Sequence, residues 1–206
     1  MPGKTKYSED DILEAAFSVV RQQGWEHCTA RSIAKALGSS TMPIYSCLKS
    51  MEDLKKRIVR KALDLMLQYQ NQDETHDDFL DMGVGYVLFA KEEQNLFKLM
   101  FHESFQETPG DESNPLANIF PGPIKEFAFK SLLERLSDSD TLKMFSREEK
   151  EKILRKAWIF SHGLAVLMNN GVLTDLGSDE IIHLLKETGK CLIEGTITMQ
   201  GREKHE

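Results

Sequence analysis

The sequence predicts an all-α protein, and three observations support this fold class. Hydroxyl residues repeatedly stand three positions before an acidic residue where an apolar repeat begins, which is the signature of a helix start. Apolar residues then recur every three or four positions, and no segment shows the two-residue alternation typical of a strand. The 206 residues, 40% hydrophobic and 29% charged, are enough to bury a core without disulfides or metals.

The first helix is expected to begin after Ser8 and to end at Gly24. Ser8 and Asp11 have the spacing of a capping box, in which each side chain accepts a backbone N–H of the other residue. Gly24 can adopt the left-handed conformation that ends a helix, and Trp25 follows with an apolar contact. The apolar residues at helical spacing are Ile12, Leu13, Ala16, Phe17, Val19 and Val20.

Two short helices are predicted next, at 30–37 and 41–48, joined by a turn that begins at Gly38. Thr29 is expected to cap the first helix and Ser40 the second. Pro43 falls in the first turn of the second helix, where its missing N–H has no intrahelical partner to lose. This is a helix-turn-helix pattern. The apolar residues expected to face each other are Ile33, Ala34, Leu37, Ile44 and Leu48.

A long helix is predicted from Met51 to about Gln72, capped by Ser50. Its apolar face carries Leu54, Ile58, Ala62 and Leu65. Thr75 and Ser146 are expected to cap two later helices. The amphipathic stretches beyond the long helix are 76–91, 93–105, 121–136, 147–170 and 178–199, and a proline-rich surface loop is expected at 109–123.

The charge is unevenly distributed along the chain. The net charge is −7, but residues 1–60 carry +3 and residues 61–206 carry −10. A basic end on an acidic body suits contact with a polyanion through one face. The alternative is that +3 over sixty residues has no functional meaning.

Several classes of protein are not expected. Cys28, Cys47 and Cys191 have neither disulfide-framework nor zinc-ligand spacing, so neither a metal nor a cofactor is predicted. The longest apolar run, 84–90, is far shorter than the ~20 residues of a membrane helix, and the N-terminus lacks a secretory signal. We therefore expect a cytoplasmic protein. No H-E-x-x-H motif, phosphate loop or nucleophile elbow is present, so no catalytic residue and no enzyme activity is predicted.

Residues 12–54 resemble the DNA-binding domain of the tetracycline-repressor (TetR) family of transcriptional regulators. The resemblance rests on Gly24-Trp25, Thr29-Ala30-Arg31-Ser32-Ile33-Ala34-Lys35-Ala36-Leu37-Gly38, Tyr45 and Ser50-Met51-Glu52-Asp53-Leu54. Later in the chain, Phe97-x-x-Met100-Phe101 and Trp158-x-x-x-His162-Gly163-Leu164 are similar to recurring positions of the family's ligand-binding body. The family often has Lys in place of Met51 and His or an aromatic residue near Cys47, which would move phosphate contacts to Lys55.

The resemblance implies a DNA-binding domain at 1–50 and a helical ligand-binding and dimerisation domain at 51–206. It further implies a homodimer, formed through the last two helices at 147–199, that binds a palindromic operator on double-stranded DNA. A small apolar or amphipathic effector would then release this repressor from its operator. The residues implied to contact bases are Arg31, Thr41, Met42, Pro43 and Ser46, and those implied to contact the sugar-phosphate backbone are Thr29, Ser40, Tyr45, Lys49 and Lys55.

Alternatives stay open for these assignments. Tyr45 could pack between helices, while Arg31 and Lys49 could be ordinary surface residues. Aromatic residues and Met of the body recur at helical spacing, which is typical of a core as well as of an effector site. The residues predicted for effector binding are Tyr86, Phe89, Phe97, Phe101, His102, Phe105, Trp158 and His162. A helical adaptor or small-molecule-binding protein that does not act through DNA is the alternative function.

Overall fold

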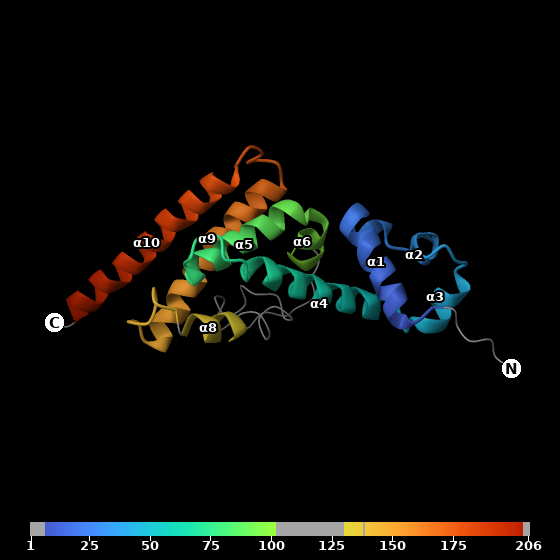
Figure 1. Ribbon diagram of the computed structural model, residues 1–206, viewed down its shortest axis with the longest axis horizontal. Coiled ribbons are helices and arrows are strands. Elements are labelled where there is room, and N and C mark those ends of the chain that lie inside the picture. The colour runs from blue at the N-terminus through green and yellow to red at the C-terminus, as the bar shows by residue number, and fades with distance from the viewer. Residues whose placement is uncertain (1–6, 102–129, 138, 204–206) are drawn as a thin grey trace, which may run out of the picture. The chain divides into compact units, whose positions relative to one another are not determined.

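The described residues of a computed structural model are helical and contain no strand, which confirms the all-α class (Figure 1). These residues are 7–101, 130–137 and 139–203, so the predicted loop at 109–123 and the start of the predicted helix 121–136 lie outside them. The described residues form two compact units. The first unit comprises 7–64 and 93–101, and the second comprises 65–92, 130–137 and 139–203.

The helices of the first unit match the predicted segments closely. They are α1 (Glu9–Gln23), the 3₁₀ helix η1 (Trp25–His27), α2 (Ala30–Ala36), α3 (Met42–Cys47), the first part of α4 (Met51–Gln70), and α6 (Gln94–Phe101). Ser8 caps α1 in a full capping box with Asp11, and Thr29 caps α2 in the same way with Ser32. Ser50 caps α4, because its Oγ accepts the N–H of Asp53 at 3.0 Å. These three predicted caps are confirmed.

The turn between α2 and α3 differs from the prediction at one position. Gly38 has a φ of +61°, the left-handed conformation expected there, and the N–H of Ser39 bonds to the carbonyl of Ala34. The residue that precedes α3 is Thr41, not Ser40, and no side chain caps this helix. A capping side chain accepts the N–H of the second or third helical residue, and Pro43 in the first turn removes one of these donors.

A buried apolar cluster holds the helices of the first unit together. Ile33 and Ala34 of α2 pack near Ile44 of α3, as the helix-turn-helix spacing predicts. Ile12 of α1 and Ile58 of α4 are also fully buried. Burial of a side chain of this kind contributes about 1.5–3 kcal/mol. The mutual orientation of α2 and α3 therefore depends on apolar contacts with α1 and α4.

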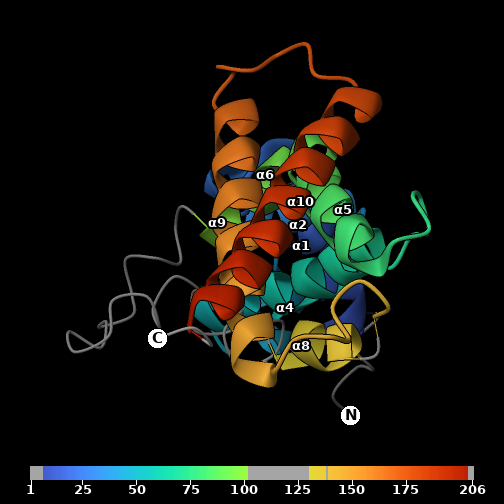
Figure 2. The same ribbon diagram turned by 90° about the vertical axis from the view of Figure 1, so that its left-hand side faces the viewer.

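The second unit contains the end of α4 with α5 (Asp78–Glu92), α8 (Lys130–Ser137), α9 (Arg147–Asn169) and α10 (Ser178–Glu203). Helices α5, α9 and α10 lie side by side (Figure 2). The end of α4 approaches α5 very closely at Gly85. A Cβ added there would lie 2.5 Å from the carbonyl carbon of Tyr69 and 2.6 Å from the Cα of Gln70. Only glycine fits this approach, which sets the position of Gln70 relative to α5.

One predicted cap of the second unit is confirmed and one is wrong. Ser146 caps α9 in a capping box with Glu149. Thr75 does not cap α5, because the N–H groups of Phe79 and Leu80 bond to the carboxylate of Asp77, at 2.9 and 3.2 Å. Thr75 instead donates to Asp81 at 2.7 Å. The cap must stand directly before the first helical residue, and α5 begins two residues later than the sequence predicts.

Candidate functional site

Helix α3 presents an apolar and aromatic face to solvent. Met42 is 77% exposed and Tyr45 is 75% exposed, whereas Ile44 between them is buried against α2. Ser46 is also exposed, and its hydroxyl donates to the carbonyl of Pro43 at 2.9 Å. The exposure of Met42 and Tyr45 leaves a large apolar and aromatic surface of α3 in solvent, where a partner could contact it.

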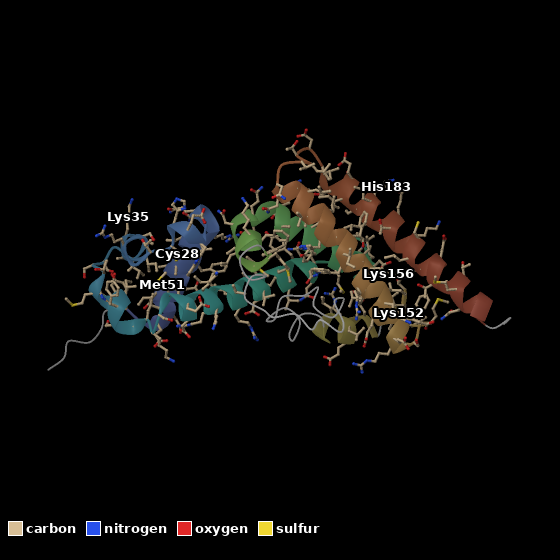
Figure 3. All side chains as sticks on the ribbon, turned by 180° about the vertical axis from the view of Figure 1, so that it is seen from behind. Cys28, Lys35, Met51, Lys152, Lys156 and His183 are labelled. Carbon is tan, nitrogen blue, oxygen red and sulfur yellow. The ribbon has the colours of Figure 1, made fainter. Side chains whose placement is uncertain are left out.

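Cations without acidic partners flank this face. Arg31 and Lys35 of α2 and Lys49 in the turn before α4 are exposed, and no residue in the described part of the chain forms an ion pair with them. Lys35 projects from α2 into solvent (Figure 3). Elsewhere in the first unit, Arg57 pairs with Glu9 at 3.1 Å and Lys61 pairs with Glu14. Three cations of this unit without an ion pair among the described residues, Arg31, Lys35 and Lys49, therefore lie on α2 or just after α3, while Lys98 of α6 is another.

The remaining residues predicted to contact DNA lie on or next to α2 and α3, except Lys55. Thr29 and Ser40 are exposed, and Thr41 and Pro43 are partly exposed. The Thr29 hydroxyl is engaged in the cap of α2, where it accepts the N–H of Ser32 at 3.2 Å. Lys55 of α4 is partly buried, and its Nζ lies 5.7 Å from the centre of the Trp25 ring. Because the Lys55 ammonium group already contacts an aromatic ring, it would have to leave this ring to contact a phosphate, which is unfavourable.

Three of the residues predicted for effector binding form a cluster in the second unit. Tyr86 of α5 is buried, and its hydroxyl lies 2.8 Å from Nδ1 of His162. The ring of His162 stacks on that of Trp158, with centroids 4.7 Å apart and planes 12° apart. Burial raises the pKa of Tyr86 well above its usual value of 10, and a hydrogen bond from Trp158 opposes this only in part. Tyr86 is therefore a neutral phenol at physiological pH.

The other predicted effector residues are not part of this cluster. Phe89 is fully buried and packs edge-on against Tyr69, with ring centroids 5.7 Å apart. Phe97 and Phe101 of α6 are buried in the first unit, where their ring centroids are 4.7 Å apart. These three side chains have the environment of core residues. The last two, His102 and Phe105, lie outside the described residues.

Two neighbouring cavities lie in the second unit. The larger, about 440 Å³, opens between α5, α9 and α10, and none of the predicted effector residues lines it. The smaller, about 40 Å³, is lined by Tyr86 and Trp158 of the predicted set. The residues that line both cavities are Phe79, Gly83, Ala157 and Ser161. The apolar residues that line the larger cavity include Phe79, Leu80, Phe160, Ile182, Leu185 and Ile193.

Sequence reasoning missed the two buried polar residues that line these cavities, Gln70 and Ser161. Gln70 lines the smaller cavity and is 4% exposed, at the end of the buried face of α4. Its position, four residues after buried Met66 and seven after buried Leu63, continues the apolar repeat with an amide. A polar residue on the apolar face of a helix is the signal that was available in the sequence.

The outer surfaces of α9 and α10 carry exposed apolar residues. Two apolar residues of α10, Ile181 and Leu185, are buried within the second unit, so they pack inside it and do not lie on its surface. Gly189 faces Phe79 of α5, at 3.4 Å from the position of an added Cβ. The apolar side chains that do face solvent on these two helices are Ile159, Phe160, Leu167, Ile197 and Met199.

Two further observations concern the described residues alone. Within 7–101, 130–137 and 139–203, no three His, Cys, Asp or Glu side chains are grouped closely enough to hold a metal ion. No helix in these ranges is both long and apolar enough to span a membrane.

Comparison with known proteins gives one distant relative with a functional name. The chain is 27% identical over 182 residues to a protein of Mycobacterium tuberculosis strain H37Rv named as an uncharacterized HTH-type transcriptional regulator. The alignment covers 85% of this chain and 77% of the relative. A protein of unknown function from Rhodococcus sp. RHA1 has a similar solved structure, with a TM-score of 0.63 at 17% identity over 95% of this chain and 98% of that one. That likeness shows the fold alone. No family model matches the sequence.

Proposed function

We propose that the chain is a transcription regulator of the TetR type that binds a palindromic operator as a homodimer. The observation that carries the proposal is the exposed face of α3, with Met42 and Tyr45 in solvent and unpaired cations beside it. The name of the distant M. tuberculosis relative supports a transcription regulator in general. The proposed division is a DNA-binding domain at 1–50 and a ligand-binding and dimerisation domain at 51–206.

The proposed contacts divide into base reading and backbone positioning. Met42 and Pro43 would meet thymine methyl groups in the major groove, because both side chains are apolar and hydrogen bonds to bases are then few. Tyr45 would donate its hydroxyl to a phosphate, and Lys49 would neutralise one. Arg31, at the start of α2, has a free guanidinium for a base or a phosphate. Thr41 and Ser46 are the further proposed base contacts, and Thr29, Ser40 and Lys55 are the further proposed backbone contacts.

The proposed dimer forms through residues 147–199. Ile159 and Leu167 of α9 and Ile197 of α10 are exposed apolar residues on adjacent helices, and a two-fold interface would remove them from water. Such an interface places two copies of α3 on one duplex, which palindrome recognition requires.

The proposed effect of a small molecule is to release the repressor from its operator. The molecule would bind the second unit, where the cavities lie. The chain would act as a cytoplasmic binding protein and not as an enzyme. An apolar or amphipathic effector fits the cavities, since ligand sites are commonly apolar clefts with a few polar groups.

Selection of bound duplexes from a random library tests the proposed function. We expect a palindrome whose two half-sites are one helical turn or a multiple of it apart. The Tyr45→Ala and Met42→Ala variants should fail to enrich the same palindrome while retaining wild-type circular dichroism. An adaptor that does not act through DNA would enrich no sequence, and that result at low salt would contradict the proposal.

A further inference from the structure

Gln70 carries a buried hydrogen-bond acceptor that lacks a donor. Its Nε2 donates to the carbonyl of Met82 at 3.1 Å, while no donor among the described residues reaches its Oε1, which has no contact with solvent. The amide cannot be turned over to repair this, because its oxygen would then face the Met82 carbonyl. A buried polar atom without a partner costs about 1–3 kcal/mol. A hydrogen-bond donor for Oε1 of Gln70 must therefore come from outside the described residues.

The orphaned amide belongs to a residue that lines the smaller cavity, next to the larger one. The smaller cavity, about 40 Å³, has room for about three water molecules or for one polar group of a ligand. Ser161 lines both cavities and is buried, and no described residue hydrogen-bonds to its hydroxyl. A second polar group without a partner thus lies where the two cavities meet.

Gly83 keeps the region between the cavities open. It lines both of them, and a Cβ added there would lie 3.6 Å from Ser161 Oγ and 3.6 Å from Leu185 Cδ1. These are ordinary van der Waals distances, so alanine fits but a larger side chain would occupy the space between them. The absence of a side chain at Gly83 leaves empty space where the two cavities share lining residues.

We propose that the two cavities form one binding site for a neutral amphipathic molecule with a hydrogen-bond donor at one end. The apolar body lies in the 440 Å³ cavity between α5, α9 and α10, which is within the size range of ligand sites. The donor, such as an amide or amine N–H or a hydroxyl, enters the smaller cavity, and Gln70 shifts so that its Oε1, closed to solvent in the unbound chain, accepts a hydrogen bond from it. An anionic end at this position would be removed from water and would offer Gln70 no donor. The inference rests on the proposed function only in calling this molecule an effector.

A matched pair of probes tests the donor requirement without knowledge of the natural molecule. 1-Naphthylamine has an apolar body and an N–H donor at one end, and the ether 1-methoxynaphthalene has a similar apolar body without a donor. The fluorescence of the amine is titrated against the protein, and the ether is measured by displacement of the amine. We expect the amine to bind about tenfold more tightly than the ether. Equal affinities, or no binding of either probe, would overturn the proposal.

Two substitutions locate the binding. Gln70→Met should weaken the amine about tenfold and leave the ether unchanged, whereas the control Gln68→Met, on an exposed position of the same helix, should change neither. Gly83→Leu should abolish binding of both probes. Thermal unfolding shows whether each variant folds. If a variant does not fold, the comparison of the two probes on the unmodified protein decides whether a donor is required. Amine binding that survives both substitutions would contradict the assignment. Equal binding of the amine to Gln70→Met and to the unmodified protein would also contradict it, because water alone would then satisfy the Gln70 amide.

The same probes separate this inference from the proposed function. If the amine binds as described and the selected operator is not released, the molecule is bound but is not an effector, and only the function as a ligand-controlled repressor fails. If the operator is bound and the donor makes no difference to probe affinity, the function stands and the inference fails.

Discussion

Replacement of Gly85 by alanine tests the packing that places Gln70 beside α5. The added Cβ would lie 2.5–2.6 Å from backbone atoms of Tyr69 and Gln70, where carbon atoms normally remain 3.5–4.0 Å apart. Backbone atoms cannot rotate away as a side chain can, so α4 and α5 must separate by about 1 Å. Overpacking of this kind costs about 1–3 kcal/mol, and alanine in a helix returns about 0.5–1 kcal/mol. Because the clash is with backbone atoms, the cost lies near the upper end, about 3 kcal/mol, and we expect a net loss of about 2 kcal/mol.

The control is Gly201→Ala on α10, outside the proposed dimer region, where an added Cβ meets no atom within 4 Å. Alanine there should stabilise the protein by about 0.5–1 kcal/mol, through helix propensity alone. For a chain of this size, 1 kcal/mol shifts Tm by about 2–4 °C. Thermal unfolding followed by circular dichroism should therefore show Tm lower by about 4–8 °C for Gly85→Ala and slightly higher for the control. A Gly85→Ala protein as stable as the control would refute the close approach.

Three further predictions concern single groups. Tyr45→Phe should weaken binding to all duplexes alike by about two- to tenfold, whereas Pro43→Ala should change the preferred operator, and selection with each variant distinguishes the two. Desolvation raises the pKa of Cys28 to about 11, so this thiol should react with a thiol reagent at pH 8 only after unfolding, and early labelling by mass spectrometry would contradict its burial. Hydrogen bonds to Glu149, first from Gln200 and then from Ser146, lower the pKa of its carboxyl group. The stability that they add to the folded protein is therefore present above about pH 4.5 and is lost as the pH falls through the lowered pKa. Ser146→Ala should make Tm depend less on pH in this range.

Local features of the fold were predictable from the sequence. Ser8, Thr29 and Ser146 cap helices where their spacing to the third residue indicates, because capping depends on adjacent residues only. Ser40 and Thr75 failed as caps for local reasons that spacing does not reveal. Pro43 removes a donor at the start of α3, and the turn before α5, with His76 at a φ of +59°, leaves Asp77 as the residue that caps.

The exposed face of α3 was predictable as well, but the cavities were not. The period of α3 turns Ile44 inward and Met42 outward, so its contact surface follows from the sequence. Helical spacing also selects the aromatic residues of the body, yet it does not tell a core residue such as Phe89 from a cavity residue such as Tyr86. That difference depends on three helices packing together, and on the space left at Gly83.

The most direct test of the central claim is the salt dependence of affinity for the selected duplex, measured for the unmodified protein and for Lys49→Ala. The logarithm of affinity falls with the logarithm of salt concentration by about 0.9 for each phosphate neutralised. A two-fold dimer loses two such contacts, so Lys49→Ala should reduce the slope by about 1.8. The control Lys143→Ala, at an exposed position of the second unit outside 147–199, should leave it unchanged. An unchanged slope for Lys49→Ala would contradict DNA binding through the surface beside α3, and a reduction of about 0.9 would contradict the two-fold dimer.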